Sequence, residues 1–424
     1  MLEIHKIKEN TSGIVHDLKK RGIEVEKNIE LVLQLDKQRI KNQQELDALL
    51  SEGNQIAQQI GQLAKKGELE NLSVLKNRAS EIKIASKELI EISKTTELNI
   101  KEVLTQIPNT PHKSVPQGQQ AKDNIIEFEW GEKKTHEGLL PHWDLAEKYN
   151  IIDFKKGAEI TGSGFPLYKG MGAQLQRALI NLFLEYNTNA GYTEYIPPYF
   201  VNEKSAFNTG QLPDKEGMMY HIQDDNLYAI PTAEVPITNI FVNTKFETSE
   251  LPIKCTAYSP CFRREAGSYG KDVRGLNRLH QFDKVEIVEI CHPDKSYDTL
   301  NTMVEHVSEL LKKLGLTFRV LKLCSGDLGF TAALTYDFEI YAPAQKKWLE
   351  VSSVSNFETY QANRLNLKYR EKGVSSLCHT LNGSSLALPR ILVGLLEQNQ
   401  TKDSILIPDI LLKYLSFDKI SVSK

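Results

Sequence analysis

The side chains best suited to chemistry in this sequence lie between Cys261 and Glu286. Arginines and lysines are interspersed there with glycines and with aromatic residues such as Phe282, between strand-like flanks. Guanidinium groups make multidentate contacts with phosphate oxygens, glycines let a loop approach a ligand closely, and an aromatic ring offers a face to a base. This composition predicts a hairpin loop that binds a polyanion. A solvated surface hairpin has the same composition, so both interpretations stay open at this point.

The elements that would position this loop belong to the part of the chain after about residue 125. Strand-like runs outnumber helical ones there, and they do not alternate regularly with helices. An α+β fold with an antiparallel sheet is therefore predicted. The predicted strands are 284–290, 317–323, 336–342 and 348–353, the last two joined as a hairpin, and the predicted helices include 171–187 and 297–314.

Residues 27–107 differ from the rest in being poor in aromatics and Pro and rich in Leu, Ile, Gln, Glu and Lys. Apolar residues recur at spacings of three and four, as in a coiled-coil seam. They form two runs around a break at Lys65-Lys66-Gly67: Leu46, Leu49, Gly53, Ile56, Ile60 and Leu63, then Leu72, Leu75, Ala79, Ile82, Leu89, Ile100, Val103 and Ile107, with Ser86, Ser93 and Thr96 in the middle of the second. Since one apolar stripe cannot be buried alone, an antiparallel helical hairpin roughly 50 Å long is predicted. A coiled coil that only joins subunits would show the same periodicity.

The prolines within residues 108–118 predict a linker between two domains. The expected organisation is an N-terminal domain at 1–107, with its hairpin at about 27–107, a linker at 108–124 and a second domain at 125–424. The net charge of −3 gives no overall indication of a nucleic-acid partner. With no apolar signal core and no run of about 20 apolar residues, no membrane association is expected and the cytosol is the expected compartment.

Several motifs favour structural rather than chemical roles. Residues 161–164, Thr-Gly-Ser-Gly, lack the remainder of a phosphate-binding loop and are interpreted as a turn. The histidines and cysteines show no zinc-binding spacing, so no zinc is expected. The five cysteines are expected to be reduced and buried, although their spacing does not exclude a catalytic thiol.

The order of residues within 261–286 carries more information than their composition. Phe-Arg-x-Glu at the end of a strand, a loop, and then Arg-x-x-x-Phe resembles the second signature motif of class II aminoacyl-tRNA synthetases. The full string CFRREAGSYGKDVRGLNRLHQFDKVE resembles the seryl-tRNA synthetase family of bacterial type. Residues 231–236 look like the Thr-x-Glu serine-binding strand of that family, and 350–356 look like its ATP and metal segment. Residues 191–202 are similar to the first class motif, at the dimer interface, and 379–390 to the third.

The resemblance implies a ligase that activates L-serine with ATP and Mg²⁺ and transfers it from seryl-adenylate to tRNA(Ser). Charging of a selenocysteine tRNA as well is left open. By resemblance, Arg263 and Arg390 are catalytic; ATP is bound by Arg263, Arg264, Glu265, Arg278, Leu279, Phe282, Glu350, Val351, Ser352, Ser353 and Arg390; serine is bound by Thr232, Ala233, Glu234, Arg263, Glu286, Asn382 and Ser384; Glu350 and Ser353 hold Mg²⁺; and Pro198 belongs to the dimer motif. Glu350 and Ser353 could equally be ordinary sheet residues.

The resemblance also gives the helical hairpin a role, because this family grips the long variable arm of its tRNA with such an arm. Lys37, Arg39, Lys41, Lys65, Lys66, Lys76 and Arg78 are available for phosphates, although each could be a solvated helix charge. The chain departs from the family at Pro389, where Gly is usual, and at Val354, where Cys is common. A proline at a helix start is tolerated, so only slight reshaping beneath the adenine is expected.

Three alternatives remain. A threonine or proline synthetase of the same class would lack the arm and carry a C-terminal anticodon domain, for which about thirty residues after Arg390 leave no room. A ligase that loads an amino acid onto a carrier protein would also lack the arm. A catalytically inactive regulator is disfavoured, because the arginines and glutamates of the motifs are all present.

Overall fold

The computed structural model describes residues 1–66, 72–134, 137–265 and 274–422. The chain forms two compact units. The first consists of Met1–Lys19 with Ile23–Pro108, and the second of Lys20–Gly22 with Asn109–Lys424. Among the described residues, no helix combines the length and the apolar character needed to cross a bilayer.

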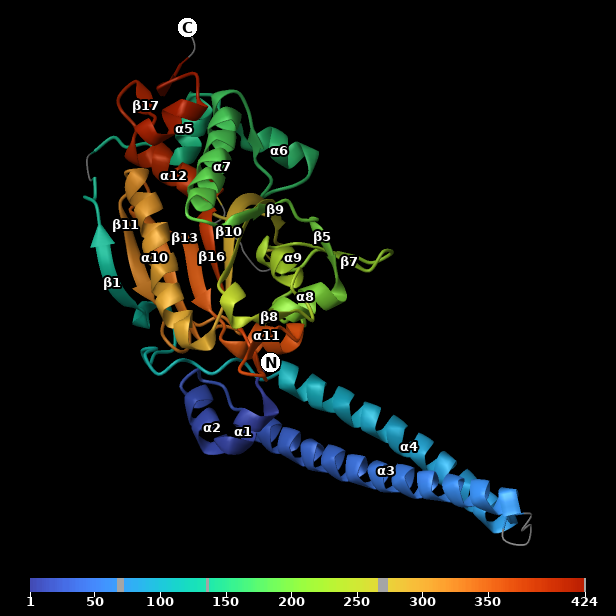
Figure 1. The fold of residues 1–424 in the computed structure, drawn as a ribbon. Helices are drawn as coiled ribbons and strands as arrows, with labels where there is room; N and C mark the ends of the chain where they lie inside the picture. Colours follow the sequence, from blue (N-terminus) through green and yellow to red (C-terminus); the bar gives the residue numbers. More distant parts are fainter. Residues whose placement is uncertain (67–71, 135–136, 266–273, 423–424) are drawn as a thin grey trace. The chain divides into compact units, whose positions relative to one another are not determined.

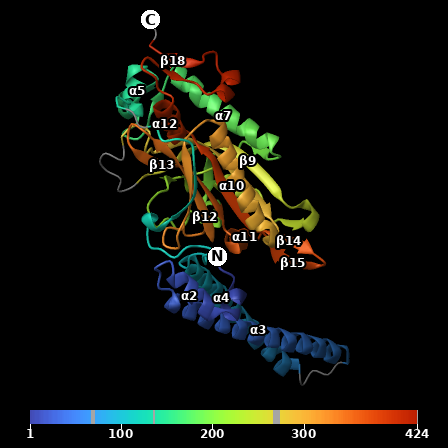
Figure 2. The ribbon, with the colours of Figure 1, turned by 90° about the vertical axis from the view of Figure 1, so that its left-hand side faces the viewer.

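The first unit is helical. Its helices are α1 (Ile4–Glu9), α2 (Thr11–Lys19), α3 (Glu26–Lys66) and α4 (Leu72–Thr105). Helices α3 and α4 pack along each other as an antiparallel hairpin (Figures 1 and 2). The predicted arm is therefore confirmed, while Gly67 and the side chain of Lys66, at its predicted break, lie outside the described residues.

The seam of this hairpin follows the predicted pattern. Leu46 and Ile56 of α3 and Ile82 and Ile100 of α4 are buried. Two polar residues of the second run, Ser86 and Thr96, are buried as well, and the Thr96 hydroxyl donates to the Ile92 carbonyl at 2.8 Å. A hydroxyl that bonds to the preceding helical turn keeps its polar group satisfied, so Thr96 lies in the seam without ending the helix, whereas the buried Ser86 hydroxyl has no hydrogen-bond partner among the described residues.

The second unit is built around an eight-stranded sheet in the order β1-β11-β12-β13-β16-β10-β9-β4. All neighbours are antiparallel except β4 and β9, which are parallel. Its strands are β1 (Ile125–Trp130), β4 (Thr193–Tyr195), β9 (Ile253–Phe262), β10 (Gln281–Cys291), β11 (Phe318–Lys322), β12 (Leu334–Ala342), β13 (Lys347–Asn356) and β16 (His379–Ala387). The predicted α+β class is confirmed, and the four strands predicted at 284–290, 317–323, 336–342 and 348–353 are found as β10, β11, β12 and β13.

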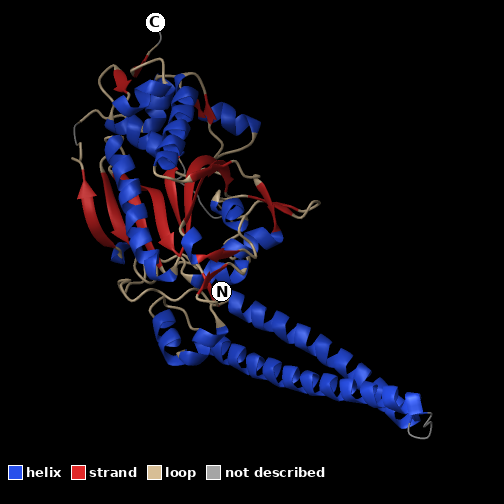
Figure 3. Cartoon of the chain, in the orientation of Figure 1, coloured by secondary structure: helices blue, strands red, loops and turns tan. Residues whose placement is uncertain are grey.

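Three longer helices, α7 (Met171–Asn189), α10 (Ser296–Lys313) and α12 (Leu388–Gln398), cover one face of this sheet (Figures 1 and 3). Val285 and Ile287 of β10 are fully buried in the core on this side. Because successive side chains of a strand point to opposite faces, the residues between and beside them point away from these helices. Strand β10 therefore presents Phe282, Lys284 and Glu286 together on the other face.

Smaller elements surround that other face and the ends of the sheet. They are α5 (His142–Lys148), β2 (Ile152–Asp153), α6 (Phe154–Ile160), β3 (Leu167–Tyr168), β5 (Phe200–Asn202), α8 (Glu203–Thr209), β6 (His221–Ile222), β7 (Leu227–Ala229), α9 (Glu234–Asn239), β8 (Lys245–Glu247), α11 (Thr359–Leu365), β14 (Lys368–Glu371), β15 (Val374–Leu377), β17 (Ser404–Leu406) and β18 (Lys419–Ser421).

The Pro-rich segment after Pro108 has no helix or strand before residue 121, yet its first part is firmly packed. Asn109 is buried, its N–H donates to the Phe330 carbonyl at 2.9 Å, and its side-chain amide donates to the Phe357 carbonyl at 2.9 Å. These bonds make the start of this segment an integral part of the second unit.

Two structural predictions about single residues are confirmed. All five cysteines are buried and free. Residues 161–164 form a turn, and Gly164 has a φ of +85°. A Cβ at Gly164 would lie 2.4 Å from the His280 ring, so only glycine fits this close approach.

Candidate active site

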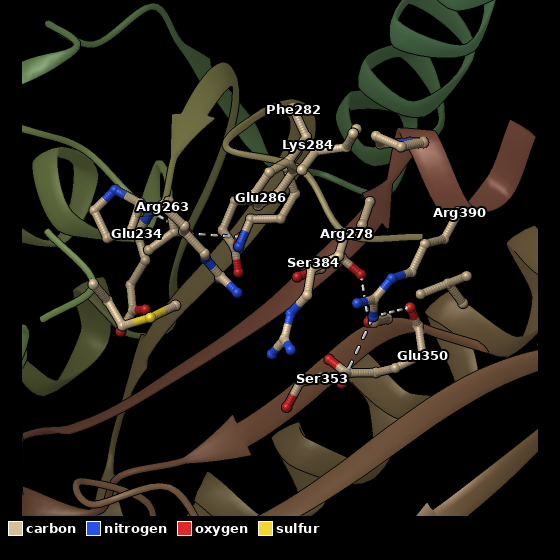
Figure 4. Close-up of a pocket in the computed structure, with 18 of the residues that line it drawn as sticks. Glu234, Arg263, Arg278, Phe282, Lys284, Glu286, Glu350, Ser353, Ser384 and Arg390 are labelled. Atoms are coloured by element: carbon tan, nitrogen blue, oxygen red, sulfur yellow. Dashed lines mark hydrogen bonds and ion pairs between the residues drawn. The ribbon is translucent and has the colours of Figure 1, made fainter. Parts of the chain in front are cut away.

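A cavity of about 430 Å³ lies over the face of the sheet that carries Phe282 and Glu286 (Figure 4). It collects most of the side chains that the sequence singled out. These are Thr232, Glu234, Arg263, Glu265, Arg278, Leu279, Phe282, Glu286, Glu350, Val351, Ser352, Ser353, Asn382, Ser384 and Arg390. They come from segments far apart in the sequence, and the sheet is what brings them together.

The β9–β10 hairpin organises the centre of this cavity. Phe282 pairs with Cys261, and Glu286 pairs with Ala257, in an unbroken antiparallel register. Arg263 continues from β9, and its N–H donates to the His280 carbonyl at 2.9 Å. Its guanidinium carbon lies 5.3 Å from the centre of the Phe282 ring. The two flanks of the predicted loop thus place a cation and an aromatic face side by side.

One end of the cavity is a buried cluster around Glu286, which is only 1% exposed. One oxygen of its carboxylate accepts from the Thr232 hydroxyl at 3.0 Å and lies 2.7 Å from the Lys284 ammonium. A buried carboxylate with a cation and a hydroxyl donor is satisfied without solvent. Lys284 was not predicted, although its place two residues from both Phe282 and Glu286 puts it on the same face of the strand.

Glu234 is the second buried carboxylate of this end. The Gln361 amide donates to its Oε1 at 2.7 Å, and the Thr380 hydroxyl donates to the Gln361 amide oxygen at 2.8 Å, which fixes the orientation of that amide. Burial, and next the neighbouring Glu286 charge, raise the pKa of Glu234 to about 7. Gln361 was not predicted either, because α11 shows no local motif that points to the cavity.

The predicted strand at 231–236 is wrong. Strand β7 ends at Ala229, and Glu234 begins helix α9. The Thr232 hydroxyl accepts the Glu234 N–H at 3.2 Å, a local bond that competes with sheet pairing and favours a helix start. Pro236 lies in the first turn of α9, a turn in which a missing N–H costs nothing.

The other end of the cavity holds charged groups that are more exposed. Glu265 accepts from the Arg278 guanidinium at 2.6 Å. Arg390 donates to the Asn277 carbonyl at 3.1 Å and to the Glu350 carbonyl at 2.7 Å. The register of β12 and β13 shifts by one residue at Val351, a bulge of the kind that re-aims side chains beside active sites. Figure 4 shows Arg278, Glu350 and Arg390 on this side of the cavity.

Three of the predicted site residues do not line the cavity. Arg264 is exposed, Ala233 is buried in an apolar cluster, and Pro198 is exposed between β4 and β5. Arg264 and Ala233 were predicted because each lies inside a motif of the family. Only the residues on either side of them, Arg263 with Glu265 and Thr232 with Glu234, line the cavity. Residues 266–273, at the tip of the predicted loop, lie outside the described residues.

The two departures from the family pattern lie at or near the cavity. Pro389 lines the cavity from the first turn of α12, where a proline fits the helix. Val354 is fully buried, and its Cγ2 lies 3.0 Å from where a Cβ of Gly383 would be. Retained activity in spite of both departures stays a prediction.

Comparison with known proteins first defines the class. A family model described as "tRNA synthetase class II core domain (G, H, P, S and T)" matches residues 220–399. These residues contain β10, β13, β16 and the whole of α12, each of which contributes residues to the lining of the cavity. The second unit is therefore the core of a class II aminoacyl-tRNA synthetase, as predicted, and the chain is an aminoacyl-tRNA ligase.

More specific matches define the family. A model described as "Seryl-tRNA synthetase N-terminal domain" matches residues 1–111. The chain is similar to a serine–tRNA ligase of Salinibacter ruber, with 44% identity over 424 residues and 99% of each chain covered. It is also 45% identical over 423 residues to a serine–tRNA ligase of Akkermansia muciniphila, with 99% of each covered. The crystal structure of seryl-tRNA synthetase from Pyrococcus horikoshii complexed with ATP superposes with a TM-score of 0.92 at 34% identity, covering 100% of both chains. The chain belongs to the seryl-tRNA synthetase family.

Proposed function

We propose that this serine–tRNA ligase uses the two ends of the cavity for the two halves of seryl-adenylate. A serine carboxylate oxygen attacks the α-phosphorus of ATP, the bond to the bridging oxygen breaks, and pyrophosphate leaves. The 3′-hydroxyl of tRNA(Ser) then attacks the carbonyl carbon and displaces AMP. The observation that carries this proposal is the buried pair of carboxylates, Glu234 and Glu286, beside an open cluster of arginines.

In the buried end, Glu286 accepts the serine hydroxyl, and Glu234 with Thr232 holds the ammonium group. Asn382 and Ser384 complete a small polar wall. Alanine lacks the hydroxyl and would leave the Glu286 carboxylate without that partner, so a site of this kind rejects it strongly. Threonine is excluded by its extra methyl group, a matter of size.

In the open end, Phe282 and Arg390 enclose the adenine, and Glu265 accepts from its amino group. Arg263 binds the α-phosphate, and Arg278 the outer phosphates. The Pyrococcus relative is complexed with ATP, which supports ATP as a ligand, and the arginines of the open end suit its phosphates. Glu265 and Arg278 are paired to each other, so ATP binding has to divide that pair between base and phosphate.

Glu350 and Ser353 are proposed to hold Mg²⁺ with ATP. Both line the cavity, and Asp337 is the cross-strand partner of Ser353. The Oδ1 atom of Asp337 is buried without a hydrogen-bond partner, which leaves acidic oxygens in excess beside these two residues. Such a set of hard oxygen ligands fits Mg²⁺. Bound there, the ion would neutralise phosphate charge as pyrophosphate departs.

ATP–pyrophosphate exchange tests this assignment. With a panel of amino acids, exchange is expected for serine alone, because only serine satisfies the Glu286 carboxylate within a small site. Equal or greater exchange with threonine, alanine or glycine would contradict the proposed specificity.

The hairpin of α3 and α4 is proposed to bind the tRNA. Of the seven predicted basic residues, three pair with carboxylates: Arg39 with Asp36 at 2.7 Å, Arg78 with Glu52 at 2.7 Å, and Lys41 with Glu45 at 3.8 Å. The side chain of Lys66 lies outside the described residues, and Lys37, Lys65 and Lys76 have exposed side chains. The three lysines are therefore the better candidates for RNA phosphates.

A triple Lys→Glu variant at 37, 65 and 76 tests the role of the hairpin. We expect the KM for tRNA in aminoacylation to rise by about tenfold or more, with greater salt sensitivity in the wild type than in the variant. A matched triple Lys→Arg variant keeps the charge and should keep the KM. Unchanged charging by the Lys→Glu variant, with exchange intact in both, would refute this role of the three lysines.

A homodimer through the first class motif is proposed as well. Strand β4 is an edge of the main sheet, and the exposed Pro198 lies just after it. Ile196, beside Pro198, is 85% exposed, and an apolar residue on an unpaired edge favours an interface. Sedimentation of the Ile196→Asp variant is expected to show monomer where the wild type shows dimer.

A further inference from the structure

The first turn of helix α5 contacts the segment just before Arg278 through His142, Trp143 and Asp144. The Trp143 ring lies 4.6 Å from the guanidinium carbon of Arg274, and the Asp144 carboxylate is 3.7 Å from that guanidinium. The third contact, from His142, is buried and reaches the backbone of Leu276. These three residues of α5 do not line the cavity, yet the segment that they contact leads directly into residues 276–279, which do.

The bond from His142 has one direction only. Its Nε2 accepts the Leu276 N–H at 2.9 Å, so a neutral ring carries its proton on Nδ1, which lies 3.1 Å from Glu397 Oε1. Full burial lowers the pKa of His142 and keeps the ring neutral. Gly275 allows the close approach: its φ is +69°, and a Cβ there would lie 2.2 Å from Nε2.

Glu397, near the end of α12, holds this imidazole in place and is itself fully used. Its Oε1 also accepts the His142 N–H at 3.1 Å and the Gln345 amide at 2.8 Å, and its Oε2 accepts the Ala344 N–H at 3.1 Å. The Gln345 amide oxygen accepts from the Asn277 side chain at 2.9 Å. Both paths from the Glu397 carboxylate therefore end on residues 276 and 277.

The backbone of Leu276 and Asn277 determines where the arginines of the proposed nucleotide end lie. Arg278 and Leu279 follow directly in the chain, and the Asn277 carbonyl accepts from Arg390 at 3.1 Å. Within the described part of the chain, the buried end, with Glu286, Lys284 and Thr232, shares no hydrogen bond with this network. A substitution that breaks a hydrogen bond of this network should therefore weaken the binding of ATP and leave the binding of serine unchanged.

We propose that His142 and Glu397 are positioning residues for ATP, which fix the 276–277 backbone so that Arg278 and Arg390 meet the nucleotide in their binding geometry. This proposal rests on the assignment of ATP to the open end of the cavity. Neither residue touches the nucleotide, and neither belongs to the residues that the motifs identify. Their effect is on the preorganisation of groups that do.

Two substitutions at one position separate this role from mere packing. In His142→Asn, the amide nitrogen can take the place of Nδ1 and still donate to Glu397, but nothing accepts from Leu276. In His142→Gln, the amide oxygen can take the place of Nε2 and accept from Leu276, but the donor to Glu397 is lost. A purely structural role predicts that the glutamine variant is worse, because it removes a donor from a buried carboxylate.

The positioning role predicts the reverse for ATP. The Kd for ATP, measured by calorimetry without serine, should rise about tenfold in His142→Asn and stay within about threefold of the wild type in His142→Gln. In exchange, the KM for ATP should follow the same order, with the KM for serine unchanged. A wild-type Kd in His142→Asn, or equal rises in both variants that follow their loss of Tm, would overturn the proposal. A wild type that binds ATP but shows no serine-dependent exchange would instead sink the proposed function.

Discussion

The two ends of the cavity solve the problem of recognition differently. At the proposed serine end, the Glu286, Lys284 and Thr232 side chains are buried, and Lys284 and Thr232 both bond to the Glu286 carboxylate. At the proposed nucleotide end, Arg278 and Glu350 keep about half of their side-chain surface exposed, and Arg278 and Arg390 are paired with Glu265 and Glu350. Selectivity for a small molecule needs groups that cannot adapt, because an adaptable pocket would accept alanine as well. A nucleotide triphosphate brings enough charge to reorganise its own site.

The largest expected effect comes from Glu286→Gln at the buried end. It removes the charged group proposed to accept the serine hydroxyl and breaks the pair with Lys284, so kcat/KM for serine should fall by at least about a hundredfold. The Kd for ATP should change little. If serine activation survives within tenfold, the buried end is as adaptable as the open one and the contrast is broken.

A smaller effect is expected from Arg278→Ala at the open end. Loss of a charge-assisted contact to phosphate should raise the KM for ATP by roughly tenfold to a hundredfold. Arg264→Ala, one residue from Arg263 but outside the cavity, is the matched control and should leave the KM near that of the wild type. Equal effects of the two substitutions would show that only the overall positive charge matters.

The smallest effect is a pH dependence of serine binding. Because the pKa of Glu234 is raised to about 7, its carboxylate is largely ionised above that pH and becomes protonated below it. The serine ammonium needs the ionised form, so the KM for serine should rise by up to about tenfold from pH 7.5 to 6, and the KM for ATP should rise less. Glu234→Gln should abolish this dependence. A flat profile in the wild type would place the Glu234 pKa well below 7 in the free enzyme.

The sequence predicted those parts of the molecule in which the spacing of apolar residues matches the repeat of the helix or strand that they form. Leu46, Ile56 and Ile82 could be placed in the seam of the hairpin from their spacing alone, and Glu286 could be placed in the strand predicted at 284–290. The family itself followed from the order of residues within 261–286. Glu234 was assigned to the site, but in a strand, since a Thr-x-Glu pattern does not distinguish a strand from a turn that begins a helix.

What could not be predicted are the supports that come from distant elements. Gln361 orients Glu234 from α11, and His142 and Glu397 fix Leu276 from α5 and α12. Each bond joins residues more than a hundred positions apart, and a single sequence carries no signal for such pairs. Lys284 differs from these, because it lies in the predicted strand two residues from Glu286 and could have been assigned to the site on that spacing.

Strand β10 also sets the distance between the two ends of the cavity. Phe282, proposed to contact the adenine, and Glu286, proposed to contact the serine hydroxyl, are carried on the same face of one strand, four residues apart. Four residues of extended chain span roughly 14 Å, and this span fixes how long a bound adenylate has to be. Adding or removing one residue between them would turn one of the two side chains into the core beneath the sheet. The distance between base and amino acid is therefore fixed by backbone geometry, and substitutions can change what is read at either end but not how far apart the two ends are.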